Sequence, residues 1–396
     1  MATQGKKYFS IRNTLKVVPD ANYYLILGEK GNGKSYSVKE YLLEECYKNK
    51  KRFAYFRRFA DDIKPDKIKA WLQDMVCDNN GRQRIKEITN GEWDDIKVDK
   101  TDIYLCRHEV VTKRKRVDFD EEGKAIYDLV DEIEIKLGPQ IGKAFWVSRR
   151  GYDSIASLAF VGYKFGIVEE FIGQVTNEDD DVPDMLIKMV STIFRDNDAK
   201  IFLLGNRISR FNPFFRKWKL EGALNQKAGT IDVYNFEEVD EVSQRKYTTK
   251  IAVESCASAG TSSSMFFGAV KKSIQGDSYD VKDSSNVFRE SLKDYENIYE
   301  ILFTFSGISY IGKLLVNSKS GALIFHVAPF TSLYKKVRRV ITNEFSSSPF
   351  TSSSFMNQIK AEVKIQELIS MNKIAFSDAL TAKEFPELLK KVHKNC

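Results

Sequence analysis

The stretch Tyr23-Tyr-Leu-Ile-Leu27, followed by Gly28-Glu-Lys-Gly-Asn-Gly-Lys34-Ser35, decides the fold of this 396-residue chain. The second part matches the pattern GxxxxGK[ST] in full, after an apolar strand and before a helix. In such a P-loop the backbone N–H groups wrap the phosphates of a nucleotide. We therefore expect ATP to be bound by Gly28, Glu29, Lys30, Gly31, Asn32, Gly33, Lys34 and Ser35. Lys34 would reach the β- and γ-phosphates, and the Ser35 hydroxyl would hold Mg²⁺.

Further apolar runs alternate with helical patterns over the first 236 residues. The predicted strands are Tyr23–Leu27, Phe53–Phe56, Phe165–Val168, Ile201–Leu204 and, more weakly, Ile231–Tyr234. This alternation predicts an α/β fold with a parallel sheet flanked by helices. Between Asp74 and Lys143 the pattern loosens into charged, irregular sequence, which we interpret as an insertion of strands and loops.

The chain then divides into two predicted domains. Residues 1–236 form the P-loop domain, and residues 237–285, with the Ser-rich run Ala257 to Ser264, form a linker. Residues 286–396 contain apolar runs separated by Ser-Gly turns, which predict an antiparallel meander at 298–305, 308–315 and 322–327. Residues 355–371 show helical spacing.

A P-loop site needs a second strand that ends in an acidic residue, and Phe165-Gly-Ile-Val-Glu169-Glu170 is the best candidate. Glu169 would hold Mg²⁺ where Asp is usual, either after a small backbone shift or through a bridging water. Glu170 is suited to activate the attacking water, which favours hydrolysis over transfer. An acid pair in solvent at a strand end is the alternative interpretation.

Two polar residues follow later helical and strand patterns. Arg195 comes directly after an apolar helical face, where it would either complement the helix dipole or reach the nucleotide of a neighbouring subunit as an arginine finger. Asn206 follows the strand Ile201–Leu204, where an amide would sense the γ-phosphate.

The composition of the chain argues against several other classes of protein. The formal charge of +7 weakly favours a polyanionic partner. The sequence has no apolar run of about 18 residues and no apolar signal segment at its start, so we expect an intracellular protein without a membrane partner. Five scattered cysteines and three histidines, none in metal-ligand spacing, argue against a zinc hydrolase.

The motifs together resemble the double-stranded DNA packaging ATPases, terminase-like motors, of small podoviruses of the Picovirinae type. The resemblance rests on the P-loop, Tyr55-Phe-Arg-Arg58-Phe, Val168-Glu-Glu-Phe171, Thr192-Ile-Phe-Arg195, and Leu204-Gly-Asn206 with Phe211-Asn-Pro-Phe-Phe215. It resumes at Leu302 to Phe325, so it covers most of the first domain and part of the second.

The resemblance implies an ASCE-type, RecA-like ATPase and assigns roles to residues. Lys34, Glu170 and Arg195 would be catalytic, Arg195 acting in trans, and Asn206 would be the sensor. It also implies a C-terminal RNase H-like domain, a vestige of a terminase nuclease. Because Leu302–Ser306 and Ile308–Val316 contain no carboxylate, we predict that nuclease activity is absent. Glu169 in place of Asp and the long 74–143 segment depart from the family pattern.

The function implied is an ATP-driven motor that moves double-stranded viral DNA into the procapsid. The expected partners are duplex DNA, further copies in a homo-oligomeric ring (a pentamer by resemblance), the portal of the procapsid and a possible structural RNA. The expected location is the host cytoplasm, with transient docking at the procapsid vertex.

Phosphate contacts need only Lys and Arg side chains that face the DNA. The candidates are Arg57, Arg58, Lys113, Arg114, Lys115, Arg116, Arg149 and Arg150. A solvated loop is an equally good interpretation of Lys113–Arg116, and Arg149 or Arg150 would alternatively act on a neighbouring nucleotide.

The alternatives to a packaging motor are a nucleoside or small-molecule kinase, another DNA-translocating ATPase, a GTPase-like switch and an active nuclease. Glu170 and Arg195 argue against the kinase, and the sequence has no NKxD segment for guanine.

Overall fold

The computed structural model consists of two compact units, one of residues 1–208 and 212–276 and the other of residues 209–211 and 277–396. It describes residues 8–119, 125–171, 181–195, 198–206, 213–220, 222–223, 226–239, 246–257, 287–288, 291–305, 308–330, 339–342, 349–378, 381–382, 384–386 and 388–389. Among the helices of these residues, none is both long and apolar enough to span a membrane.

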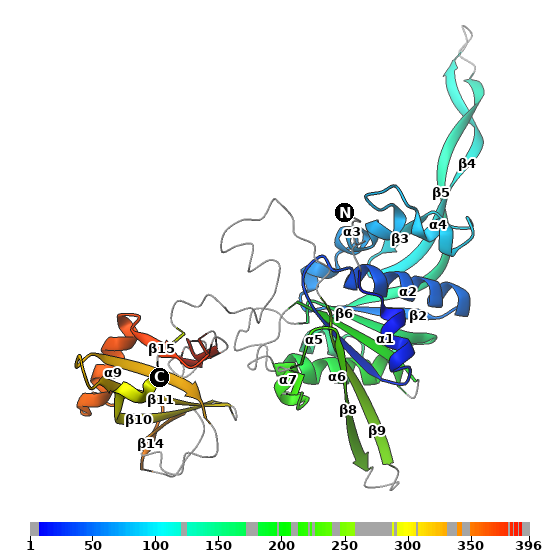
Figure 1. Cartoon of the computed structure of the whole chain (residues 1–396). Helices are drawn as coiled ribbons and strands as arrows, with labels where there is room; N and C mark the ends of the chain where they lie inside the picture. Colours follow the sequence, from blue (N-terminus) through cyan, green and yellow to red (C-terminus); the bar gives the residue numbers. More distant parts are fainter. Residues whose placement is uncertain are drawn as a thin grey trace, which may run out of the picture. The chain divides into compact units, whose positions relative to one another are not determined.

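The first unit is built on one large mixed sheet (Figure 1). In the described residues its strand order is β3-β4-β5-β2-β6-β7-β1-β9-β8. The strands are β1 (Tyr23–Leu27), β2 (Arg52–Arg57), β3 (Asp95–Asp99), β4 (Asp102–Phe119), β5 (Ala125–Trp146), β6 (Tyr163–Glu169), β7 (Lys200–Gly205), β8 (Thr230–Val239) and β9 (Lys246–Ser255). From β5 to β9 neighbouring strands run parallel, which confirms the predicted parallel sheet.

Helices cover both faces of this sheet, because its central strands are apolar on both sides. One core contains residues of α1 (Ile11–Val17), α2 (Lys34–Asn49), α3 (Pro65–Val76) and α4 (Arg84–Ile88). The other contains residues of α5 (Arg149–Asp153), α6 (Val182–Phe194) and α7 (Pro213–Lys217). The short 3-10 helix η1 (Ala60–Ile63) follows β2. Phe214 and Phe215 of the Phe-Phe motif are buried in this second core.

Two features of the first unit differ from the expectation. The boundary predicted at residue 236 falls inside β8, and β9 lies within the predicted linker although it pairs with the central strand β1. Only Ile251, Ala252 and Val253 form an apolar run in β9, and charged residues flank them. The hydrophobic pattern of the sequence therefore gives little sign of a central strand here. The predicted strand Ile231–Tyr234 is present in β8 but pairs antiparallel.

The predicted insertion contains strands, as expected, and also the short helix α4. Here β4 and β5 pair over nearly their whole length as an antiparallel hairpin that projects from the sheet, and we call this hairpin the β4–β5 arm (Figure 1).

The second unit contains an antiparallel meander, as predicted, made of β10 (Tyr295–Phe305), β11 (Ile308–Asn317) and β12 (Leu323–Pro329). Short parallel strands extend it, giving the order β14-β13-β10-β11-β12-β15 in the described residues. The added elements are η4 (Leu292–Asp294), β13 (Val340–Thr342), β14 (Thr351–Ser352), α9 (Lys360–Ser370) and β15 (Ile374–Phe376). Its core is aromatic, with Phe303, Phe325 and Phe385 fully buried, and Ile365 and Leu368 of α9 pack on it.

Candidate nucleotide site

The P-loop joins β1 to α2 through glycines in left-handed conformations. Gly31 has φ 84° and Gly33, which caps α2, has φ 90°, a region that L-residues rarely adopt. Gly28 is required for a different reason. A Cβ atom at Gly28 would lie 2.8 Å from the Cβ of Cys256, which follows β9. The loop therefore follows a tight path at the carboxyl end of the sheet.

Lys34 is buried at the start of α2, with 5% of its surface exposed. Its Nζ donates hydrogen bonds to the carbonyl oxygens of Gly28 (2.9 Å) and Glu29 (2.7 Å) and to Oδ1 of Asn32 (3.2 Å). These oxygens hold the ammonium group at the centre of the loop that would surround the phosphates. Burial lowers the pKa of Lys34 to about 8.

This pKa predicts a pH dependence of nucleotide binding. Below pH 8 the folded protein carries the charged ammonium that attracts phosphate, whereas above pH 8 binding must first add a proton. We expect affinity to fall by up to about tenfold per pH unit above pH 8. Calorimetric titrations from pH 7 to 9.5, in buffers of different ionisation enthalpy, would measure proton uptake. An affinity that is constant over this range would contradict the prediction.

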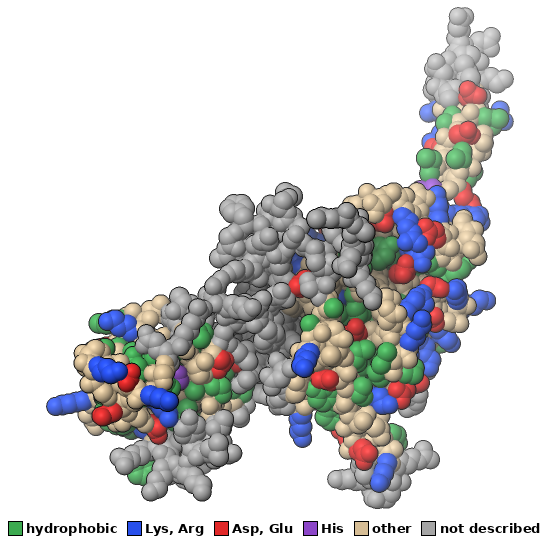
Figure 2. All heavy atoms as spheres, in the orientation of Figure 1, with side chains coloured by type: hydrophobic (Ala, Val, Ile, Leu, Met, Phe, Trp, Pro, Cys, Tyr) green, Lys and Arg blue, Asp and Glu red, His purple; other side chains and the backbone are tan. Residues whose placement is uncertain are grey.

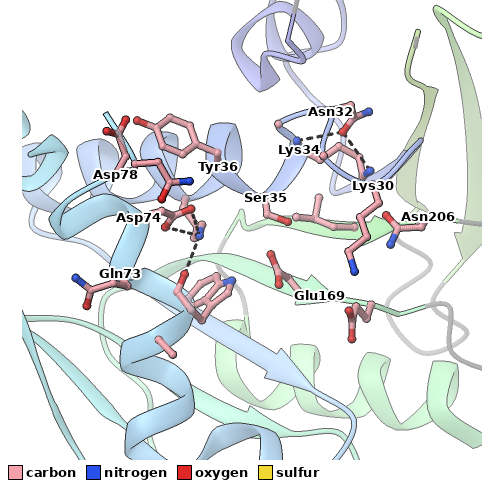
Figure 3. Close-up of a pocket in the computed structure, with 18 of the residues that line it drawn as sticks. Lys30, Asn32, Lys34, Ser35, Tyr36, Gln73, Asp74, Asp78, Glu169 and Asn206 are labelled. Carbon is pink, nitrogen blue, oxygen red and sulfur yellow. Dashed lines mark hydrogen bonds and ion pairs between the residues drawn. The ribbon is translucent and has the colours of Figure 1, made fainter. Parts of the chain in front are cut away.

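One cavity of about 840 Å³ lies beside the P-loop. Lys30, Asn32 and Ser35 line one side of it, and the ends of β6 and β7 contribute Glu169, Glu170 and Asn206 (Figure 3). Because parallel strands end at the same edge of a sheet, the P-loop residues meet Glu169, Glu170 and Asn206 although more than a hundred positions separate the two groups in sequence.

Glu169 ends β6, opposite Leu204 of β7. In Figure 3 the side chains of Ser35 and Glu169 point toward one another from α2 and β6. Within the described residues, Oε1 of Glu169 is a buried oxygen without a hydrogen-bond partner. A buried acceptor of this kind fits a hard cation or its bound water, so Ser35 and Glu169 suit Mg²⁺.

Glu170 follows with φ 52°, an uncommon conformation for a residue with a side chain. Its side chain is 67% exposed and forms an ion pair with Nη2 of Arg57 at 3.1 Å, at the end of β2. Arg57 also contacts Asp62 at 3.2 Å. Arg57, a candidate DNA contact by sequence, is thus a partner of the candidate catalytic carboxylate.

Arg195 caps the end of α6 with φ 44° and donates a hydrogen bond to the carbonyl oxygen of Leu158 (3.2 Å). Its side chain is exposed, and Arg195 is not among the residues that line the cavity of its own chain.

The other candidate DNA residues lie at several places. Arg58 stacks over the ring of Phe59, and Arg149 and Arg150 are exposed in α5. Lys113, Arg114, Lys115 and Arg116 lie on β4 of the arm. Lys113 pairs with Glu134 and Lys115 with Glu132, so these cations are partly balanced by β5, and Figure 2 shows basic and acidic side chains side by side there.

The α3 side of the cavity, which Trp71, Gln73 and Asp74 line, was not predicted from the sequence. Lys39 reaches this side from α2. Its Nζ donates to both carboxylate oxygens of Asp74 (2.6 Å each) and to the carbonyl oxygen of Trp71 (2.7 Å). The spacing of Ser35 and Lys39, one helical turn, was the available sign that Lys39 shares the face of the site.

No protein-family model matches this chain, and no curated protein is significantly similar in sequence. Among solved structures, the bacteriophage Phi-29 viral genome packaging motor assembly matches with a TM-score of 0.54 and 16% identity, over 97% of this chain and 99% of that one. The Phi-28 gp11 DNA packaging motor matches with a TM-score of 0.45 and 15% identity, over 98% and 99%. The N-terminal domain of the DNA packaging ATPase from bacteriophage phi29 matches with a TM-score of 0.40 and 20% identity, over 65% and 99%. The match to the Phi-29 assembly, whose TM-score exceeds 0.5, confirms at the level of the fold the resemblance that the motifs predict, and the chain has the fold of a bacteriophage DNA-packaging motor.

Proposed function

We propose that this chain is an ATPase that drives double-stranded viral DNA into a procapsid. The observation that carries the proposal is the meeting of the P-loop, two carboxylates and an amide in one cavity, in a chain whose fold matches a packaging motor over nearly its full length. A kinase needs an acceptor site, whereas Glu170 beside the phosphate site favours water as the acceptor.

Each side chain has a definite task in this proposal. The loop amides and Lys34 would hold the phosphates, and Ser35 and Glu169 would hold Mg²⁺, which when bound would supply positive charge beside the phosphates. Glu170 would accept the proton of the attacking water after leaving Arg57. Asn206, at the end of β7, would contact the γ-phosphate.

Arg195 would act in trans, in a homo-oligomeric ring that we propose to be a pentamer. Its position outside the cavity of its own chain supports this role. We expect Arg195→Ala to lower ATP hydrolysis by about 10³-fold or more while nucleotide binding persists. Steady-state hydrolysis and nucleotide titration would measure the two effects.

Mixing variants tests the trans assignment. Arg195→Ala mixed with Glu170→Gln should recover part of the activity, because one site can combine an intact Glu170 with a neighbour's Arg195. Lys34→Ala mixed with Glu170→Gln should recover none, since both defects lie in the same chain's half of the site. A mixture of the first pair no more active than its components would refute the assignment.

The remaining parts of the proposal concern partners. The likeness to a packaging motor supports duplex DNA and a procapsid portal as partners, with or without a structural RNA. The proposed location is therefore the host cytoplasm, at the procapsid vertex. We propose the exposed Arg149 and Arg150 and the basic residues of the β4–β5 arm as contacts to DNA phosphates.

We also propose that the second unit is RNase H-like and lacks nuclease activity. Its meander with parallel strands β13 and β14 added beside β10 supports this topology. The meander also supplies few acids, and Glu300 of β10 is paired with Lys313 of β11 at 3.4 Å.

The experiment that tests the motor is steady-state ATP hydrolysis with and without duplex DNA over a range of protein concentrations. A ring motor predicts activity that rises with DNA and climbs steeply with protein concentration. Hydrolysis that responds to neither would favour the kinase or the switch.

A further inference from the structure

Trp71 is held rigidly at the α3 side of the cavity. Its ring stacks on Tyr55 of β2, with 3.9 Å between centroids and an interplanar angle of 7°. The Nζ of Lys39 lies 5.5 Å from the ring centroid and donates to the carbonyl oxygen of Trp71. Contacts on the ring and on the backbone thus fix the direction of the indole.

Among the residues that the structure describes, none accepts a hydrogen bond from the indole N–H of Trp71, although its nitrogen is buried. Within the described residues, the buried side-chain nitrogens and oxygens without partners are Asn32 Nδ2, Trp71 Nε1, Trp93 Nε1, Glu169 Oε1, Trp218 Nε1 and Gln226 Oε1. Asn32, Trp71 and Glu169 all line the nucleotide cavity. A buried donor without a partner costs free energy, and in a ligand site the ligand supplies the missing acceptor.

The place of Trp71 indicates which part of a ligand it would meet. The P-loop holds one side of the cavity, and the ends of β6 and β7 mark the γ-phosphate end. Next in the sheet beyond β6 is β2, whose Tyr55 supports Trp71. Trp71 therefore lies past Glu169 as seen from the P-loop. An indole N–H only donates, so its partner must be an acceptor, and the acceptors at the γ-phosphate end of a nucleotide are oxygens.

We propose that Nε1–H of Trp71 donates a hydrogen bond to an oxygen that arrives with the γ-phosphate of Mg–ATP, either a phosphate oxygen or the water it holds. Trp71 would then distinguish ATP from ADP within the site. This inference rests on the proposed function, because it requires that the cavity binds a nucleoside triphosphate.

The variant Trp71→Phe tests it, since phenylalanine keeps the ring on Tyr55 and removes the donor. Affinity for a non-hydrolysable ATP analogue with Mg²⁺ should fall by about 10-fold or more, while affinity for Mg–ADP stays unchanged. Trp218→Phe is the matched control, because Trp218 also has a buried, unpartnered Nε1 but does not line the cavity. It should change neither affinity.

A second readout reports on the N–H itself. In ¹⁵N-labelled protein, the indole resonance that Trp71→Phe removes should move downfield with the ATP analogue and stay in place with ADP. Equal loss of affinity for both nucleotides, or no shift of that resonance, would overturn the inference. A wild-type protein that binds neither nucleotide would instead overturn the proposed function.

The two sources of the oxygen are separated by adding aluminium fluoride, a planar mimic of the transferring phosphate, to Mg–ADP. A direct bond to the transferring group predicts that the mimic shifts the Trp71 resonance as the ATP analogue does. A bond to the water alone predicts the same shift without a nuclear Overhauser effect between the indole proton and the fluorine atoms of the mimic, because the water then lies between them, whereas a direct bond places a fluorine atom beside that proton.

Discussion

Lys34→Ala will lower ATP hydrolysis by about 10²- to 10³-fold or more. The ammonium group is held by the carbonyl oxygens of Gly28 and Glu29 and by Asn32, at the point where the P-loop closes around the phosphates. Alanine removes the charge that faces the β- and γ-phosphates. Steady-state hydrolysis measured at saturating Mg–ATP is the direct test.

The fold should survive this substitution. Burial already disfavours the charged form of Lys34, as its pKa of about 8 indicates, so its removal relieves a desolvation cost. Lys48→Ala is a suitable control, because Lys48 lies near the other end of α2 and pairs with Glu44 in solvent. A Lys34→Ala protein with wild-type hydrolysis would mean that the cavity is not the hydrolytic site.

The largest expected change in stability lies in the second unit, where Arg339 and Glu362 form a buried ion pair. Arg339 is 5% exposed and Glu362 is fully buried, with Nε and Oε1 2.8 Å apart. Glu362 also accepts hydrogen bonds from the hydroxyl of Tyr299 (2.9 Å) and from the backbone N–H of Met356 (2.6 Å). Arg339 donates to the carbonyl oxygens of Phe350 and Ser354. The pair thus connects β10 and α9 with the residue that precedes β13.

Glu362→Ala should destabilise this unit by about 3–5 kcal/mol, because it leaves the guanidinium group of Arg339 buried without its counter-charge. Urea unfolding followed by far-ultraviolet circular dichroism would show this loss of stability as a separate transition of the second unit at a lower urea concentration. The combined Arg339→Met and Glu362→Met variant should recover part of the loss, since no buried charge remains.

Lys364→Ala provides the matched control on the same helix. Lys364 pairs with Glu367 in solvent at 2.7 Å, so its removal should change stability by less than about 0.5 kcal/mol. If Glu362→Ala costs no more than this control, the buried pair does not stabilise the unit.

Much of the fold follows from local sequence. The runs Tyr23–Leu27, Phe53–Phe56 and Ile201–Leu204 are strands because they are continuously apolar and both faces of the sheet are covered. The meander of the second unit is also evident from apolar runs between glycine turns. The hydrophobic pattern of the sequence does not predict β9, because this strand depends on its pairing with β1 and not on its own composition.

The sequence by itself determined the P-loop, the acidic end of β6 and the amide after β7, because each is a short motif whose chemistry requires those residue types next to a strand end. Only the tertiary structure decided which distant side chains complete the site. Arg57 meets Glu170 across 113 positions, Lys39 meets Asp74 across 35, and Trp71 joins the cavity from α3. Such contacts depend on the order of the strands and on the packing of the helices. Both are set by the burial of residues that are distant in sequence, so no local pattern of residues encodes them.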